Sequence, residues 1–508
     1  MGSLHLRGGL CAAMLLLHVT ACEKAKEPPP KRDFGDGIYE AVVTACEKAK
    51  EPPPKRDFGD GIYEAVPRGP FHVDESLATE PAEPPKSNAN APTVVLVVLD
   101  TVRADHTSIC GYARKTTPYL QSLVDRGATH TCRAYTPGDW SLPSHASYFT
   151  GVSVARHGAH YARSDDDADE EGKRVRSLFV YPLRDDIPTL AEQMRERGYQ
   201  TVLVSDNGLL SEAGLQRGFS IVAARPKKHD PRVDWVPPTL KRVLAESVDP
   251  DKPLFLVLNY IQAHDPWITP DPKLGWDLLD PQMVPEEFGV GFKLFLQRKL
   301  EPHETRFMRR QLYDLYDYGV YREDRALQQS LSTLETAGWL NPGYRIGITA
   351  DHGELLMEHG LWRHLFVYEA NTRVPFLYWT DGKAPTLPEP FPAIAIHDLL
   401  LRGELPEPLP TVESVAIPNP DNKHRRGPVG KPAAAIWVGN EKLVWMGGEY
   451  LRIDLANDPE ERAPKPLGEH PKRSELEALV AAIESADRRQ PKVDEALVAQ
   501  LRALGYVE

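Results

Sequence analysis

The sequence lacks several features that would assign it quickly to a class. Its first apolar run, residues 10–19, is interrupted by His18 and is too short to cross a bilayer, which takes about 20 residues. Positive charge is in deficit, with 60 Lys and Arg against 73 Asp and Glu, and this argues against broad nucleic-acid binding because such surfaces are basic. A P-loop and an HExxH zinc motif are both missing, so neither of those catalytic sites is present.

Cysteine is also scarce, at five residues in 508. Cys11 lies in the N-terminal apolar run, and Cys22 and Cys46 lie in the polar stretch that follows it. Only Cys110 and Cys132 belong to the body of the chain. In an exported protein these two can form one disulfide, and they can equally be two buried thiols. The sequence leaves both alternatives open.

The N-terminus has the pattern of a targeting segment. Arg7 precedes the apolar run, and the run ends in Val19-Thr20-Ala21-Cys22, which resembles a bacterial lipoprotein signal with lipid attached to Cys22. We therefore expect a signal peptide over residues 1–21 and an exported protein that is lipid-anchored to the bacterial envelope through Cys22. A plain secretory signal and an unprocessed N-terminus are the alternatives.

A tandem duplication follows the targeting segment. Residues 19–42 recur without change at 43–66. Two copies are too few for a folding repeat, which requires at least three units. The content of Pro, Lys and Glu instead predicts an extended linker over residues 22–90.

The central part of the chain alternates between strand and helix patterns. Residues 93–99, TVVLVVL, are typical of a strand buried on both faces of a parallel sheet. Such alternation indicates βαβ units and a mainly parallel sheet. The other buried strands are expected at 201–204, 254–258 and 344–349, and the helices between them near 117–127, 187–198 and 305–337. Beyond residue 383, short antiparallel strands are expected within 433–446 and 449–453, followed by helices near 474–485 and 493–504.

One stretch, Trp140 to Gly151 (WSLPSHASYFTG), predicts a helix with a serine at its start. Proline is favoured at a first helical position, so Pro143 is expected to open the helix and Ser141 to stand at its N-terminal end. The free N–H groups and partial positive charge of a helix N-terminus favour an alkoxide, a phosphate or a sulfate. The alternative is that Ser141 only caps the helix.

Polar residues follow the expected strands, where ligands bind in open α/β sheets. Two carboxylates, an imidazole and a serine hydroxyl are the parts of a divalent-cation site. A bound cation lowers the pKa of a coordinated hydroxyl, and a nearby histidine can protonate a leaving oxygen. The residues in question are Asp100, Asn207, His264, Asp351 and His352.

Several motifs in a fixed order carry a family resemblance. VVLDTVRAD (97–105), WSLPSHASYFTG with RHG after it, HDPW, ITADHGELLMEHGLW (348–362) and YEANTRVPF resemble successive motifs of the sulfatase family, within the alkaline phosphatase superfamily. The resemblance runs from about residue 92 to the C-terminus and includes IDLANDPEE and LRALGY. It implies an α/β/α sandwich with a mainly parallel central sheet, plus a smaller C-terminal unit with an antiparallel sheet and terminal helices.

The resemblance also implies roles for individual residues. Asp100, Asp351 and His352 match ligands of one divalent metal ion, with Ca²⁺ or Mn²⁺ favoured and Zn²⁺ or Mg²⁺ as alternatives. Ser141 occupies the nucleophile position and also touches the metal. His264 matches the catalytic histidine of the family.

The chain departs from the family pattern at several places. In proven sulfatases the nucleophile is a Cys or Ser oxidised to formylglycine. The modification signal needs an Arg where this chain has His145, which counts against formylglycine at Ser141 and leaves the state of this residue open. We place His145 with Ser141 and His264 among the catalytic candidates. His364, a further candidate, falls where a Lys is usual, and the Lys-x-His pair expected near residues 205–209 is missing.

The sequence thus predicts a metal-dependent hydrolase of sulfate esters that acts through Ser141. The alternatives are a phosphodiesterase, a phosphonate monoester hydrolase or a phospho-group transferase with unmodified Ser141, and a catalytically weak binding protein that retains the fold. The expected partners are a small-molecule, glycan or lipid ester, and the membrane through Cys22, but no nucleic acid. We expect the catalytic domain at residues 91–382 and a C-terminal subdomain at 383–508.

Overall fold

The computed structural model describes residues 82–87, 89–161, 180–226, 233–265, 267, 299–364, 366–417 and 431–485. The expected signal peptide, Cys22, the duplicated segment and the helix expected near 493–504 lie outside these ranges. Among the helices within them, none combines the length and the apolar composition needed to cross a bilayer.

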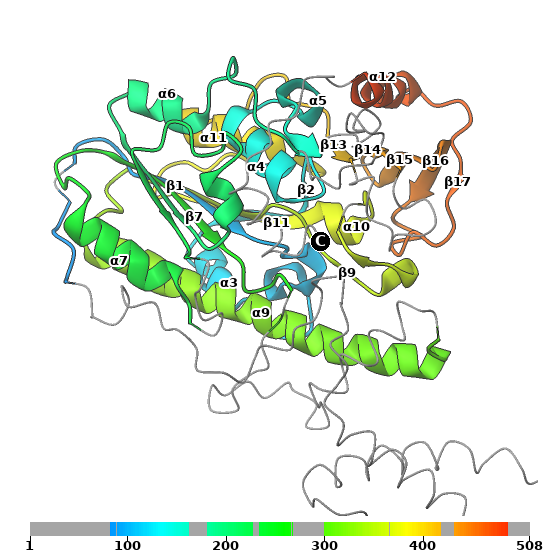
Figure 1. The fold of residues 1–508 in the computed structure, drawn as a ribbon, viewed down its shortest axis with the longest axis horizontal. Coiled ribbons are helices and arrows are strands. Elements are labelled where there is room, and N and C mark those ends of the chain that lie inside the picture. The colour runs from blue at the N-terminus through cyan, green and yellow to red at the C-terminus, as the bar shows by residue number, and fades with distance from the viewer. Residues whose placement is uncertain are drawn as a thin grey trace, which may run out of the picture. The chain divides into compact units, whose positions relative to one another are not determined.

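A parallel run of strands forms one side of an eight-stranded sheet (Figure 1). At its centre, β1 (Val94–Leu99) pairs in parallel with β7 (Leu254–Tyr260) and with β8 (Arg345–Ala350). Beyond β7, β5 (Gln200–Ser205) and β6 (Ile221–Ala224) extend the run in the same direction. Every side chain of β1 is buried, as its continuous apolar sequence predicts for a strand covered on both faces.

The other side of the sheet contains strands that the sequence patterns did not predict. β11 (Arg373–Trp379) lies antiparallel between β8 and β2 (Thr129–Tyr135), and β12 (Phe391–Pro392) forms the outer edge. β2 lacks a continuous apolar run, and β11 contains Pro375, which is rarely found inside a strand. The sheet is therefore mixed, although most of its pairings are parallel.

Helices cover both faces of this sheet, which confirms the expected α/β/α sandwich (Figure 1). The helices over one face are α4 (Ser141–Thr150), α6 (Leu190–Glu196) and α11 (Ile396–Arg402). Those over the other face are α3 (Pro118–Asp125), α7 (Val236–Glu246) and the long α9 (Pro302–Thr336). β12 is a strand of the large sheet, and α11 packs against β1 and β8 of that sheet. The α/β/α sandwich therefore includes residues beyond the expected division at 382.

The C-terminal unit is the antiparallel sheet that the sequence predicts. Its five strands run in the order β13-β14-β15-β16-β17, and α12 (Arg473–Glu484) packs on one face through Leu476 and Val480. The opposite face packs toward Tyr135 and Val367. The strand bounds are Glu413–Ala416, Ala433–Val438, Glu441–Met446, Glu449–Asp454 and Lys465–Pro466.

The chain enters the large sheet at the amino end of β1, where Asn341 holds it. The side-chain amide of Asn341 donates to the carbonyl oxygens of Ala89 (3.1 Å) and Ala91 (2.7 Å), and its oxygen accepts from the amide of Thr93 (2.9 Å). This entry point lies at the edge opposite to the carboxyl ends of the parallel strands.

Cys110 and Cys132 form a disulfide, which decides between the two alternatives left open by the sequence. The bond joins the short 3-10 helix Ser108–Cys110 to β2 and closes a loop with a sequence separation of 22. The loop includes Arg114, which pairs with Asp314 and Asp317 of α9.

Removing this disulfide is expected to lower the free energy of unfolding by about 3 kcal/mol, because an unlinked loop of this length gains entropy in the unfolded chain. The test is urea denaturation of the Cys110→Ser/Cys132→Ser variant beside the oxidised wild type. Wild-type protein treated with reductant serves as the control and should match the variant. A variant as stable as the oxidised protein would show that the disulfide does not restrain the unfolded chain.

Candidate metal centre and active site

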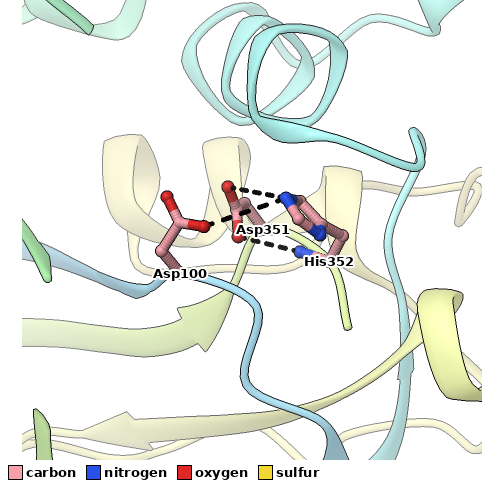
Figure 2. A group of neighbouring side chains, drawn as sticks. All are labelled: Asp100, Asp351 and His352. Atoms are coloured by element: carbon pink, nitrogen blue, oxygen red, sulfur yellow. Dashed lines mark hydrogen bonds and ion pairs between the residues drawn. The ribbon is translucent and has the colours of Figure 1, made fainter. Parts of the chain in front are cut away.

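Two aspartates lie side by side at the carboxyl edge of the sheet (Figure 2). Leu99 at the end of β1 stands opposite Ala350 at the end of β8. The next residues, Asp100 and Asp351, therefore leave the sheet together, and His352 follows. Both carboxylates and the imidazole are fully buried, and one ligand atom of each lies within 4.8 Å of the others.

Each of these three residues turns an acceptor without a hydrogen-bond partner toward the others. The atoms are Oδ1 of Asp100, Oδ2 of Asp351 and Nε2 of His352. Nδ1 of His352 donates to the carbonyl oxygen of Gly353 at 2.9 Å, so Nε2 carries the lone pair. Nε2 lies 3.6 Å from Oδ2 of Asp351 and 3.9 Å from Oδ1 of Asp100. Buried acceptors that lack a donor cost about 1–3 kcal/mol each, so this donor set fits a divalent cation.

The backbone around Thr101 orients Asp351. Oδ1 of Asp351 accepts hydrogen bonds from the amides of Thr101 (3.2 Å) and His352 (2.9 Å). Thr101 has a φ of 61°, which is rare for a β-branched residue. Its carbonyl oxygen accepts from the hydroxyl of Tyr316 in α9 at 2.6 Å, which helps to hold this strained conformation. Thr101 thus orients the Asp351 carboxylate through its backbone N–H.

The charges at the site favour a bound cation. Burial raises the pKa of Asp100 well above its ordinary value, and the negative charge of Asp351 raises it further. Burial lowers the pKa of His352, which keeps the imidazole in the neutral form that binds metals. A cation among these groups would stabilise both carboxylates in their charged form.

Ser141 is the first residue of α4, two positions before the proline expected to open the helix. Trp140 occupies the N-cap position, so Ser141 is not the cap. The fully buried Oγ of Ser141 donates to Oδ2 of Asp100 at 3.4 Å. The hydroxyl therefore lies beside the candidate metal ligands, at the positive end of a helix.

Asn207 connects Ser141 to the same carboxylate. Its side-chain N–H₂ lies 2.8 Å from Oδ2 of Asp100 and 3.3 Å from Oγ of Ser141. The amide of Leu209 donates to the Asn207 side-chain oxygen at 3.0 Å, which fixes the orientation of the amide group. The sequence placed Asn207 among the polar strand ends but gave it no role. The signal was its position two residues after the end of β5.

His145 lies one helical turn after Ser141 and is fully buried. Its Nδ1 hydrogen-bonds to the carbonyl oxygen of Ser141 at 2.8 Å and lies 3.7 Å from Oδ2 of Asp351. Burial lowers the pKa of His145. The residue that replaces the modification-signal arginine thus contacts both the expected nucleophile and an expected metal ligand.

Two further histidines, His264 and His364, extend the group on the side of His352, away from Asp100 and Asp351. The ring centroid of His364 lies 4.5 Å from that of His352 and 5.8 Å from that of His264. Nδ1 of His364 lies 3.6 Å from a carboxylate oxygen of Glu354, and burial lowers the pKa of His264. The structure therefore gathers all seven of the expected site residues into one buried group.

Comparison with known sequences gives a consistent result. The sequence model of the Sulfatase family matches residues 92–398, which is more than half of the chain. An arylsulfatase of Clostridium perfringens is 24% identical over 337 residues, covering 57% of this chain and 69% of the relative. A choline-sulfatase of Rhizobium meliloti is 24% identical over 406 residues, covering 68% of this chain and 74% of the relative.

Solved structures share the fold. One, a protein in complex with its substrate D-glucosamine-2-N,6-O-disulfate, has a TM-score of 0.56 at 17% identity and covers 78% of this chain and 100% of its own. The phosphonate monoester hydrolase of Silicibacter pomeroyi has a TM-score of 0.54 at 19% identity and covers 78% of this chain and 94% of its own. With the match over residues 92–398, these findings show that the chain belongs to the sulfatase family.

Proposed function

We propose that this protein is a metal-dependent hydrolase of sulfate esters that uses Ser141 as its nucleophile. The observation that carries the proposal is the convergence of three unpaired buried acceptors from Asp100, Asp351 and His352. The Ser141 hydroxyl adjoins this group at the start of α4. The two curated relatives, an arylsulfatase and a choline-sulfatase, support sulfate as the group that is transferred.

The side chains around Ser141 have distinct parts in this reaction. A bound divalent cation would supply positive charge that favours ionisation of the nucleophilic hydroxyl at position 141, whether that hydroxyl belongs to serine or to hydrated formylglycine. Asn207 donates toward Oγ of Ser141 and Oδ2 of Asp100, which keeps the two oxygens adjacent. The backbone N–H groups in the first turn of α4 stabilise negative charge on the transferring group. His264 or His364 protonates the leaving oxygen.

A second candidate function is phosphoryl chemistry with unmodified Ser141. The observation that favours it is His145, which occupies the position of the arginine in the formylglycine signal and hydrogen-bonds to the Ser141 backbone. In this case Oγ of Ser141 attacks phosphorus, an alcohol leaves, and water or another hydroxyl then accepts the phospho-group. The first acceptor gives a phosphodiesterase or phosphonate monoester hydrolase, and the second gives a transferase.

The mass of the peptide that contains Ser141, combined with a substrate panel, separates these functions. Loss of two hydrogens from the peptide would mean formylglycine, and we then expect turnover of aryl sulfates. An unchanged serine would favour phosphate diesters and phosphonate monoesters. A protein that turns over none of these esters but binds one divalent ion per chain would contradict both hydrolase proposals. A protein without stoichiometric metal would fit the binding-protein alternative.

Metal affinity is expected to fall as the pH is lowered. Protons compete with the metal for Asp100, whose pKa is raised by burial and by Asp351, whereas the lowered pKa of His352 keeps its imidazole available. The dissociation constant for Mn²⁺ should therefore increase about tenfold per pH unit below the pKa of Asp100. Titrations at successively lower pH measure it, down to the pH at which the protein begins to unfold, with Asp100→Asn as the control that should bind weakly at every pH. An affinity that does not vary with pH in the wild type would contradict the assignment of Asp100.

We also propose that the protein is exported and lipid-anchored through Cys22, and that it acts on a sulfated or phosphorylated small molecule, glycan or lipid. The motifs of the N-terminus support the anchor. The sulfated-sugar complex among the solved structures supports a glycan. Substitution of Cys22 with alanine should move the protein from the membrane fraction to the soluble fraction of the producing cells. Retention in the membrane fraction would reject the anchor.

A further inference from the structure

A fully buried lysine lies outside the site, in the C-terminal sheet. Lys442 of β15 has no exposed surface, although lysine is almost never fully buried unless it is paired. Its Nζ lies 2.6 Å from Oε1 of Glu461 and 3.5 Å from Oε1 of Glu369, and it donates to the carbonyl oxygen of Val367. Lys442 therefore links its own sheet to the segment that follows His364. We name Lys442, Glu369 and Glu461 the clamp.

Further contacts fix the two carboxylates of the clamp. Oε2 of Glu461 accepts from the backbone amide of Glu369 at 2.7 Å. Glu369 also accepts from the Trp437 indole (2.8 Å) and from the Tyr135 hydroxyl (3.0 Å). Glu461 has a φ of 53°, a left-handed conformation that costs a non-glycine residue free energy. Strain of this kind persists only where surrounding contacts hold it, which is what the clamp does.

The segment held by the clamp contacts the site directly. Glu369 begins the short helix α10 (Glu369–Thr372). Asn371 of this helix accepts from the amide of Gly353 at 2.7 Å through its carbonyl oxygen. Its side-chain amide donates to the carbonyl oxygen of Arg363 at 3.1 Å. Asn371 thus holds the residue after His352 and the residue before His364.

Gly353 fits this segment closely. A Cβ atom at Gly353 would lie 2.1 Å from the carbonyl oxygen of Ala370, so the two backbones leave no room for a side chain. A displacement of α10 would therefore move Gly353 and, with it, the adjacent His352. The contacts form a continuous chain from Lys442 through α10 to the metal-ligand segment.

From this arrangement we propose that Lys442 is a positioning residue, which acts through the clamp and Asn371 to hold residues 351–364 in the geometry that binds metal. The proposal rests on the metal site proposed above. It makes the C-terminal sheet a part of the catalytic apparatus, in addition to its own packing against α12.

The experiment compares Lys442→Met with Leu443→Ala in the full-length protein. Leu443 is the next residue of β15, is fully buried, and packs on the opposite face of the sheet with α12, so its truncation destabilises the sheet without touching the clamp. The measurements are the Mn²⁺ dissociation constant and the thermal unfolding midpoint of each variant. A second variant, Lys442→Met/Glu461→Gln, avoids an unpaired buried carboxylate if the single variant does not fold.

We expect the Lys442 variants to bind Mn²⁺ about tenfold more weakly than wild type, while Leu443→Ala keeps wild-type affinity despite its lower unfolding midpoint. Unchanged Mn²⁺ affinity in the Lys442 variants, with a wild type that binds the ion, would overturn this inference alone. A wild type that binds no divalent ion would overturn the metal site as well.

Discussion

Ser141→Ala is expected to reduce kcat by about 10⁴-fold or more, because the variant keeps the site but loses the atom that attacks the ester. The Ser141 hydroxyl is buried, adjoins Asp100 and lies at the start of α4, where no other hydroxyl contacts Asp100 among the described residues. The assay uses the best ester from the substrate panel, with metal content measured in parallel. Metal should still bind, because the three unpaired acceptors remain, although with lower affinity than in the wild type, because the hydroxyl expected to touch the metal is lost.

Ser144→Ala provides a matched control for this experiment. Ser144 lies in the same helix and is also fully buried, but its Oγ donates to the carbonyl oxygen of Gly138 at 3.1 Å and serves the packing of the turn. The control should lose about 1 kcal/mol of stability and retain turnover. Full activity of Ser141→Ala on every substrate that the wild type accepts would reject the nucleophile assignment.

Asp351→Asn is expected to weaken metal binding by about 10³-fold and to abolish turnover, because one of two charged ligands becomes neutral. The asparagine side-chain oxygen can still accept from the amides of Thr101 and His352, so the local backbone is kept. Calorimetric titration with Mn²⁺ and the ester assay together measure the effect.

The same substitution has an opposite effect on the metal-free protein. The charge of Asp351 contributes to the raised pKa of Asp100, so its removal relieves repulsion between the two buried carboxylates. In the presence of a chelator, Asp351→Asn should unfold at or above the wild-type temperature, whereas with metal it should unfold below it. Wild-type metal affinity in this variant would show that Asp351 is not a ligand.

Much of the parallel sheet could be predicted from the sequence, because its buried strands are continuous apolar runs. β1 and β8 end directly before Asp100 and Asp351, so the pattern also indicated where the candidate ligands leave the sheet. β2 and β11 were not predicted. β2 mixes polar with apolar residues, and β11 contains Pro375. Their places depend on pairing between segments far apart in the chain, which local patterns do not encode.

The site shows the same division between local and distant information. Residue type and strand ends indicated Asp100, Asp351 and His352, because each of these can bind a metal wherever it stands. The part played by Asn207 depends on the direction of its amide group, which the backbone of Leu209 sets after folding. No sequence pattern indicated a role for Lys442, because that role depends on Glu369 and Glu461, whose carboxylates lie 73 and 19 positions away in the chain.

The place where Asn341 holds the chain before β1 has a practical consequence for immobilising the protein on a support. The hydrogen bonds of Asn341 fix residues 89–93 at the amino edge of the sheet, while Ser141 and its neighbours lie at the carboxyl edge. The six residues of β1 separate the two edges by about 20 Å. Protein coupled to beads through its N-terminal segment should therefore keep the carboxyl edge of the sheet, beside which Ser141 lies, directed away from the support.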